Sequence, residues 1–390
     1  MTEFVAVFDQ WIRSSFVEMN TELEGLYFAQ EDRSETGKVG DFIKQTLVEE
    51  GRTYIVDLLV EGNTDEGFDQ AFDLLGNVGL YMAACRRHDL TEPSRETRSP
   101  LVEASALAMH LGTSLGVAPR FATSHLAMHN SAKNGVYKSF TSLEAELLFL
   151  EYNTRSVFAY RRAADALVRT LPLGISHPVT YHLLKDAKTA LQDVLKINSE
   201  LFAQLDSERF FYSVRPYYKP YRVGQHEYRG ANAGDFAGIN EIDILLGLCS
   251  ANNISYSQLL VDKLLFMMPH DQDRLRDVMR RQSLLDGFLE ASERHAREHW
   301  YQSNAGLFLE VCEAHGETAA QHHDQLVSKF IQQPSAELSE VHLKHITASG
   351  PPLQVLLNSL EKLRDLRTAA DRDDIPSRHA DFQRLRISLR

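Results

Sequence analysis

Two histidines and a glutamate lie close together in the stretch HAREH, residues 295–299. The spacing His-x-x-Glu-His is the arrangement found in inverted zinc metallopeptidases. Residues four apart share one face of a helix, so His295 and His299 could bind one zinc ion while Glu298 acts as the base. The neighbouring residues are mostly charged, which favours a solvated helix face, and short motifs of this kind often match by chance. Zinc chemistry is therefore kept as an alternative only.

A second group of histidines lies in CEAHGETAAQHHDQLVSKFI, residues 312–331. Apolar residues form one stripe of this predicted helix together with His315. His322 and His323 lie on the two flanks of the stripe, and periodicity alone does not decide which of them faces inward. The stretch is compatible with a core helix that contains a hydrogen-bonded histidine. Taken alone, the pattern favours this core helix, although a single helical histidine is also one way in which proteins hold heme iron.

An arginine lies within the aromatic run FFYSVRPYYKPYRV, residues 210–223. Arg215 could make a cation–π contact at the edge of an aromatic core. It could instead bind a carboxylate, because a guanidinium group offers two parallel hydrogen bonds to such a group. An aromatic amino acid would suit both the arginine and the rings. Pro216 and Pro220 predict an extended connection here rather than a strand.

Small residues dominate the segment GANAGDFAG, residues 230–238. A glycine-rich phosphate loop requires a preceding strand and the spacing GxGxxG, and this segment has neither. The small side chains indicate that the backbone approaches something flat or bulky before a helix begins.

Helical periodicity extends over most of the chain and predicts an all-α fold. The polar loop at residues 86–100 contains two prolines and interrupts it. We expect a smaller N-terminal helical part at residues 1–140 and a large helical domain at residues 141–390. The predicted helices span residues 66–85, 101–112, 142–171, 178–207, 239–250, 256–266, 273–292, 305–331 and 353–369.

Composition limits the classes of function. The 390 residues include 41 basic and 54 acidic ones, for a net charge of −13, which is unfavourable for binding nucleic acid or anionic membranes. The three cysteines are far apart and form no metal or disulfide motif. We find no signal peptide and no apolar run long enough to cross a membrane. The expectation is a soluble cytoplasmic protein, and a homo-oligomer is left open.

Five segments, in the same order and with comparable spacing, resemble the indoleamine and tryptophan 2,3-dioxygenase superfamily of heme proteins. The resemblance covers roughly residues 100–370, and the wording RGANAGDF…NEID is closer to the pyrrolnitrin-biosynthesis branch than to the kynurenine-forming enzymes. The similar segments are GTSLGVAPRFATSHLAMHN, FFYSVRPYY, GANAGDFAGINEIDILLG, FMMPHDQDRL and HHDQLVSKFIQQPSA.

The resemblance implies a helical heme fold, heme b as cofactor, and O2 with an indole-type aromatic amino acid as substrates. It assigns the iron to His323, leaving His322 as its neighbour. It further assigns the substrate carboxylate to Arg215 and the substrate ring to two phenylalanines. The residues placed against heme or substrate by the resemblance are Phe210, Phe211, Ala233, Gly234 and Thr347.

Several positions depart from the family pattern. Pro351 and Pro352 remove two backbone donors from the substrate loop next to Thr347. An arginine found before the proximal histidine in indoleamine dioxygenases is Ala320 here. The distal residue has two candidates, Arg161 and His125, and the alternative for His125 is a polar residue on a helix surface. The expected reaction is 2,3-dioxygenation, with a PrnB-like or hydroxylase-type heme protein as the alternative.

Overall fold

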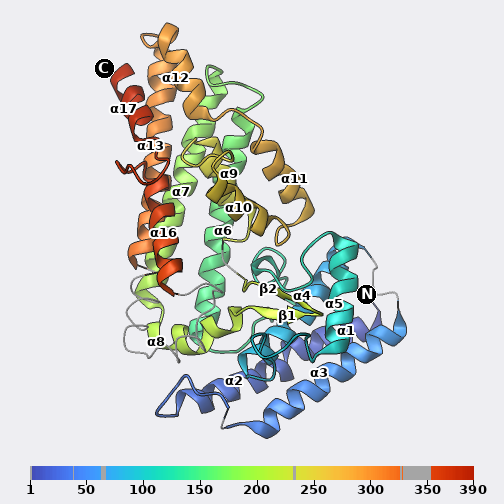
Figure 1. Cartoon of the computed structure of the whole chain (residues 1–390). Helices are drawn as coiled ribbons and strands as arrows, with labels where there is room; N and C mark the ends of the chain where they lie inside the picture. Colours follow the sequence, from blue (N-terminus) through green and yellow to red (C-terminus); the bar gives the residue numbers. More distant parts are fainter. Residues whose placement is uncertain (1, 38, 63–66, 232–233, 326, 328–352) are drawn as a thin grey trace. The chain divides into compact units, whose positions relative to one another are not determined.

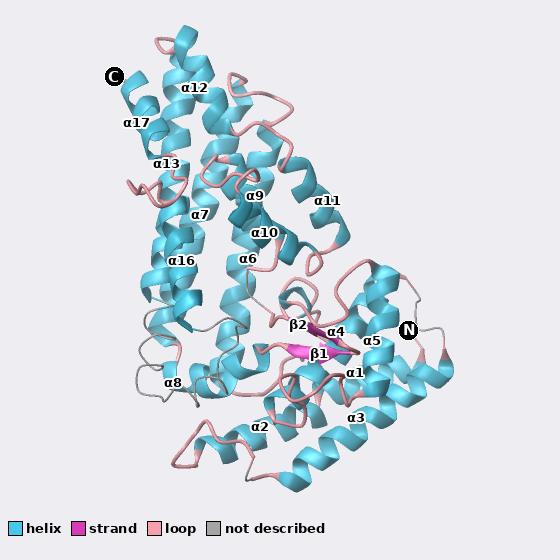
Figure 2. Ribbon diagram, viewed as in Figure 1, coloured by secondary structure: helices cyan, strands magenta, loops and turns pink. Residues whose placement is uncertain are grey.

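The computed structural model describes residues 2–37, 39–62, 67–231, 234–325, 327 and 353–390. These residues form helices almost throughout, which confirms the predicted all-α class (Figures 1 and 2). Within the described ranges, no helix is long and apolar enough to cross a lipid bilayer. The described chain divides into two compact units, and it passes from one to the other between residues 151 and 152, 204 and 205, and 235 and 236.

Unit 1 contains the described residues within Met1–Glu151 and Leu205–Asp235. Aromatic side chains from its helices and from the run at residues 210–218 fill its core. A short antiparallel hairpin, β1 with β2, closes that run, and Tyr221 pairs with Tyr228. The elements of unit 1 are α1 (Glu3–Arg13), α2 (Ser15–Phe28), α3 (Asp41–Glu61), α4 (Phe68–Arg87), α5 (Val102–Leu115), η1 (Thr123–His125), α8 (Ser207–Arg209), η2 (Phe210–Val214), η3 (Arg215–Tyr218), β1 (Tyr221–Val223) and β2 (His226–Tyr228).

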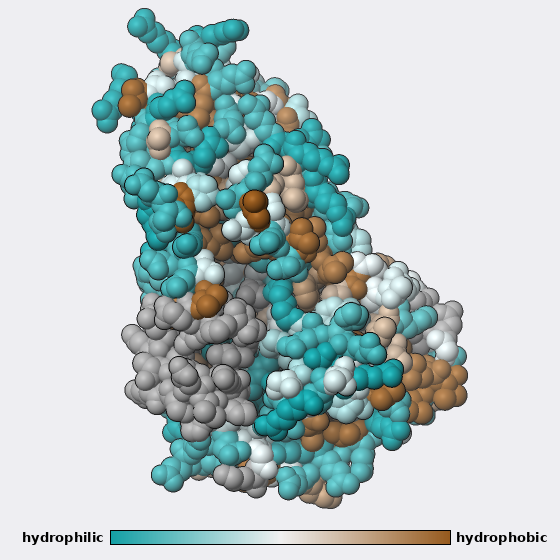
Figure 3. Space-filling view, in the orientation of Figure 1, coloured by the Kyte–Doolittle hydropathy of each residue, from teal (hydrophilic) through white to brown (hydrophobic). Residues whose placement is uncertain are grey.

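Unit 2 contains the described residues within Tyr152–Gln204, Phe236–Ser328 and Gln354–Arg390. Helices α7 and α13 lie side by side along their lengths, and one apolar core joins them to the shorter helices (Figure 1). Hydrophilic residues cover most of the outer face of its last helices, as expected for helices with one buried face (Figure 3). Its elements are α7 (Pro178–Gln204), α9 (Ala237–Leu245), α10 (Ile254–Leu264), α11 (Pro269–Val278), α12 (Leu284–His295), α13 (His299–Gln321), α16 (Leu353–Arg367) and α17 (His379–Ser388).

Helix α6 (Glu144–Thr170) begins in unit 1 and continues in unit 2. The sequence placed a boundary near residue 140, whereas these compact units are discontinuous in sequence. Where independently folding domains begin and end therefore stays a prediction.

Two predicted elements are wrong. The helix expected at residues 273–292 is two helices, because Ser283 caps α12 by accepting a hydrogen bond from the Asp286 backbone N–H. The extended connection expected at residues 210–223 is instead a π-helical turn, a 3₁₀ turn and strand β1. Pro216 occupies the start of the 3₁₀ turn, where its missing N–H carries no penalty.

Candidate functional site

Arg215 is a buried cation in unit 1. It begins η3, is 6% exposed, and its guanidinium carbon lies 5.6 Å from the centre of the Phe211 ring. Within the part of the chain that the structure describes, its side chain makes no hydrogen bond or ion pair, and Nη1 is fully buried. Burial lowers the pKa of Arg215 to about 10, so the group remains charged at neutral pH. A buried charge is stable only when it is paired, so this position calls for an anionic partner.

Phe210 and Phe211 lie next to Arg215 in the π-helical turn η2. Both rings are buried, and the Phe210 ring centre is 5.1 Å from that of Phe149. The turn follows α8, whose N-cap Asp206 accepts a hydrogen bond through its carboxylate from the Arg209 backbone N–H. π-helical turns are rare and are frequently found at functional sites. The structure thus brings together the two phenylalanines and the arginine, although their predicted roles stay predictions.

His323 belongs to unit 2 and lies in the helical stretch that continues from α13 through residues 322–325. Its side chain is 17% exposed, whereas His322 is exposed to solvent. The Nδ1 atom of His323 lies 3.1 Å from Oδ1 of Asp324 and 3.2 Å from Nη1 of Arg364. In the tautomer protonated at Nδ1, this atom donates to Asp324 and Nε2 carries the lone pair. In the opposite tautomer, Nδ1 accepts from Arg364, because a guanidinium group only donates.

This donor set fits a heme-iron ligand. Histidines that bind metals usually donate their second ring N–H to a carboxylate or carbonyl, which fixes the tautomer and the ring orientation. Asp324 supplies such a carboxylate next to His323. The ligand role of His323 itself stays a prediction.

A buried ionic network holds the helices around His323 in unit 2. Asp243 of α9 is completely buried and accepts two hydrogen bonds of 2.8 Å from Arg367 of α16. It also accepts hydrogen bonds of 2.7 Å from the Tyr256 hydroxyl and, in the matching tautomer, from Nε2 of His315. Burial alone would raise the pKa of Asp243, but Arg367 and His315 hold that pKa well below its usual range. Arg364 lies one helical turn before Arg367, so the network also positions the side chain that contacts His323.

The distal candidate Arg161 lies on α6 in unit 2. Its Nη2 atom is 3.0 Å from Nε2 of His270 and 3.4 Å from Oδ1 of Asp271. These contacts fix the guanidinium group at the beginning of α11. A role for Arg161 towards a bound ligand stays a prediction.

The other distal candidate, His125, is buried in unit 1, so the alternative of a helix-surface residue is wrong. Its ring stacks on Phe72 with centres 3.9 Å apart, and Nδ1 accepts a hydrogen bond of 2.8 Å from the Ala122 backbone N–H. A side chain at Gly76 would have its Cβ 2.6 Å from this ring. Burial lowers the pKa of His125 to about 3, so the imidazole is neutral. These contacts describe a core histidine, and a ligand-directed role stays a prediction.

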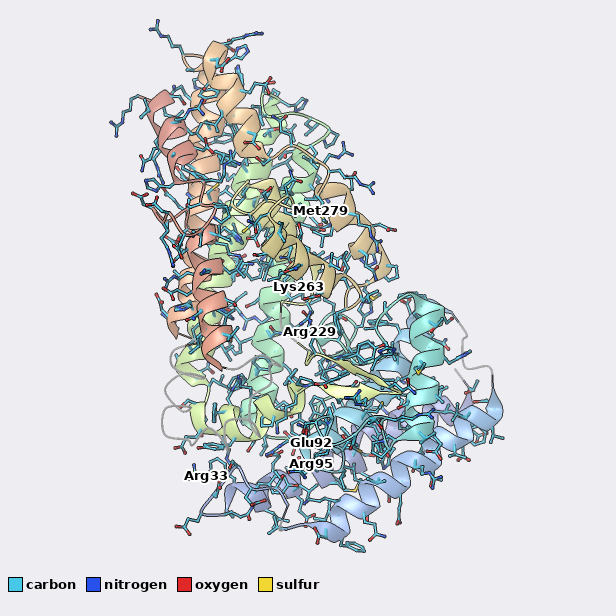
Figure 4. All side chains as sticks on the ribbon, in the orientation of Figure 1. Arg33, Glu92, Arg95, Arg229, Lys263 and Met279 are labelled. Carbon is cyan, nitrogen blue, oxygen red and sulfur yellow. The ribbon has the colours of Figure 1, made fainter. Side chains whose placement is uncertain are left out.

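The segment of small residues is described only in part. Ala233 lies outside the described residues, as does Thr347 with the prolines that follow it. Gly234 lies in a turn and is partly buried. Arg229, labelled in Figure 4, follows β2 and pairs with Asp235 at 2.6 Å on the other side of this segment.

The HAREH motif does not lie on one helix, so the geometry assumed for zinc binding is wrong. Helix α12 ends at His295, Glu298 caps the next helix, and α13 begins at His299. The Glu298 carboxylate contacts Nδ1 of His295 at 2.6 Å and accepts a hydrogen bond from the Trp300 indole. Among the residues with described positions, no group of three His, Cys, Asp or Glu side chains is arranged to hold a metal ion.

Sequence reasoning missed the Asp243 network and two tyrosines of η3. The signal for Asp243 was a single acidic residue between apolar ones in the predicted helix NEIDILLG. The signal for the tyrosines was their place in the same aromatic run as Arg215. Tyr217 and Tyr218 are both buried, and neither hydroxyl has a hydrogen-bond partner among the described residues.

A comparison with protein families agrees with the sequence resemblance. The family model for monodechloroaminopyrrolnitrin synthase PrnB matches residues 2–389, which is nearly the whole chain. This confirms the predicted likeness to the pyrrolnitrin branch of the heme dioxygenase superfamily and identifies an enzyme. The chain therefore belongs to the monodechloroaminopyrrolnitrin synthase PrnB family of heme-dependent oxidoreductases.

Proposed function

We propose that this protein is a heme b oxygenase that acts on an indole-type aromatic amino acid. The observation that carries the substrate class is the buried guanidinium group of Arg215, which lies over the Phe211 ring and has no ion-pair partner among the described residues. Membership of the PrnB family supports the cofactor.

His323 would hold the heme iron through Nε2. Asp324 would accept the hydrogen bond from Nδ1 and so keep the imidazole in the tautomer that can bind a metal. Arg364 only donates hydrogen bonds, so its contact with Nδ1 suits the opposite tautomer, and the iron-binding tautomer would require Asp324 rather than Arg364 as the partner of Nδ1. When bound, the heme supplies the iron that activates O2, while the protein orients the substrate and excludes water.

Arg215 would bind the carboxylate of the substrate through two hydrogen bonds, and Phe210 and Phe211 would pack against its ring. The pairing would remove the penalty of burying a cation that has no partner among the described residues. Ala233, Gly234 and Thr347 keep their proposed contacts with heme or substrate, which the family resemblance alone supports.

Two reactions are candidates for this protein. In 2,3-dioxygenation, both atoms of O2 enter the C2–C3 bond of the indole ring. The family match over residues 2–389 instead favours a synthase reaction whose product contains a pyrrole, as the family name describes.

Product analysis tests the proposal. The heme-loaded protein is incubated with tryptophan, O2 and a reductant, and the products are identified by mass spectrometry. A pyrrole product supports the synthase reaction, N-formylkynurenine supports 2,3-dioxygenation, and a hydroxylated amino acid supports the hydroxylase alternative. If tryptophan and its ring-chlorinated forms all remain unchanged while heme is bound, the proposed activity is wrong.

A further inference from the structure

Lys219 is a buried amine in unit 1 that none of the roles above uses. It is the C-cap residue of η3 and is 3% exposed. Two further lysines are buried among the described residues, and both have partners. Lys44 donates a hydrogen bond to the Thr36 carbonyl, and Nζ of Lys138 lies 2.6 Å from Oδ1 of Asp73. Within the part of the chain that the structure describes, the Lys219 side chain has no hydrogen bond or ion pair.

Two arginines at the end of α4 are held against the segment that carries Lys219. Nε of Arg86 donates a hydrogen bond of 3.3 Å to the carbonyl of Pro220, the residue that follows Lys219. Nη2 of Arg87 donates one of 2.9 Å to the carbonyl of Tyr212, in the turn before η3. The backbone contacts therefore bring two cations to the neighbourhood of the buried amine.

The charges around Lys219 disfavour its ammonium form. Burial, followed by the positive charges of Arg86 and Arg87, lowers the pKa of Lys219 to about 7. The carboxylates of Asp89 and Glu92 oppose this shift with smaller effects. A neutral or negatively charged group is thus more stable at this position than a cation. Above pH 7 most of Lys219 is a free amine, whereas an exposed lysine with a pKa of about 10.4 stays protonated.

A free amine in such surroundings is suited to react with CO2. The lone pair of Nζ attacks the carbon atom, an N–C bond forms, and one C=O bond opens to a carboxylate oxygen while an N–H proton leaves to solvent. The product is a carbamate with one negative charge, and the step needs no oxidant or reductant. Guanidinium groups stabilise a carboxylate-type anion through charge-assisted hydrogen bonds, which Arg86 and Arg87 can supply. The low exposure of Lys219 favours a reagent as small as CO2.

We propose that Lys219 is a carbamylation site, at which CO2 adds reversibly to Nζ and the resulting negative charge lies beside Arg86 and Arg87. None of these three residues is assigned to heme or substrate. The inference therefore stands or falls independently of the proposed function.

The test observes the carbamate directly by NMR. The full chain is labelled with 15N at the lysine Nζ atoms and equilibrated with 13CO2 at low pressure, so that a lysine carbamate gives a 13C signal split by its bonded 15N. We expect one dominant signal of this kind. It should disappear in Lys219→Met and in Lys219→Gln, and it should persist in Lys44→Arg, which alters a buried lysine that has a partner.

The pH dependence of the signal identifies the amine without any variant. A lysine that is already neutral releases one proton when CO2 adds, so the ratio of carbamate to unmodified amine should rise about tenfold per pH unit above pH 7. An ordinary protonated lysine releases two protons, so its ratio should rise about a hundredfold per pH unit.

Three results would overturn the inference. They are the absence of a lysine carbamate in the unmodified protein, a signal that survives in a folded Lys219 variant, and the steeper pH dependence of an ordinary lysine. If neither Lys219 variant folds, the signal and its pH dependence in the unmodified protein still decide the question.

Discussion

Replacing Asp243 by Asn should strongly destabilise the protein. The carboxylate is completely buried and receives hydrogen bonds from Arg367, Tyr256 and His315. The amide removes the negative charge and one acceptor oxygen, so Arg367, whose side chain is 14% exposed, loses its counter-ion. Breaking one partner of a buried ion pair costs about 3–5 kcal/mol. We expect the free energy of unfolding, measured by urea titration, to fall by about that amount.

The matched control for Asp243→Asn is Asp277→Asn in the same unit. Asp277 forms an ion pair with Arg281 at 3.0 Å, and both side chains are exposed. Surface pairs of this kind contribute about 0–1 kcal/mol. A double variant, Asp243→Asn with Arg367→Met, leaves neither charge without its partner. Its loss of unfolding free energy should therefore be about 1–3 kcal/mol smaller than the sum of the losses of the two single variants. Equal losses for the variants at 243 and 277 would refute the assigned role of the network.

The remaining predictions concern unit 1. Gly76→Ala should destabilise the protein by about 1–3 kcal/mol, because the new Cβ would meet the His125 ring. The control Gly25→Ala in α2 should not destabilise it, because nothing lies within 4 Å of a Cβ at that position. Equal melting temperatures of the two variants would contradict this packing. The pKa of His125 is about 3 in the folded protein and 6.5 in the unfolded chain. Between these values only the unfolded chain binds the proton, so the protein has its full stability above pH 6.5 and loses stability as the pH falls towards 3. The free energy of unfolding should therefore drop by about 1.4 kcal/mol per pH unit in that window, and His125→Asn should remove this part of the slope in urea titrations at several pH values. Arg215→Met should weaken binding of carboxylate ligands without lowering the melting temperature of the free protein, and a large fall in that temperature would show that the cation serves the fold.

The helices were largely predictable because apolar residues recur at the helical period and the fold buries the face that they form. Helix α4 begins at Phe68 and α6 ends at Thr170, close to the predicted ends at residues 66 and 171. The break before α12 was also present in the sequence, since Ser283 and Asp286 have the spacing of an N-terminal cap. A continuous amphipathic pattern across residues 273–292 concealed that signal.

The local structure around Arg215 was not predictable from the run itself. Two prolines favoured an extended chain, but burial of Phe210 and Tyr217 against distant aromatic residues favours compact turns. The sequence did single out Arg215 by its aromatic neighbours. It could not show that the guanidinium group lacks an anionic partner among the described residues, because that depends on every side chain brought close by the fold.

The choice between His322 and His323 could not come from helical periodicity either. The two residues are adjacent, and the contact of Arg364 with the His323 ring comes from 41 residues further along the chain. Such a long-range contact leaves no periodic signal near the histidines. The family resemblance nevertheless assigned the iron to His323, and that assignment is still to be tested.

The most direct test of the account is the absorption spectrum of the purified protein after addition of hemin, recorded for His323→Ala and His322→Ala beside the unmodified chain. We expect a Soret band of near-stoichiometric intensity for the unmodified protein and for His322→Ala, and loss of most of the bound heme in His323→Ala. Retention of the band in His323→Ala with its loss in His322→Ala would contradict the assigned iron ligand. An unmodified protein without a Soret band would contradict the proposed heme chemistry itself.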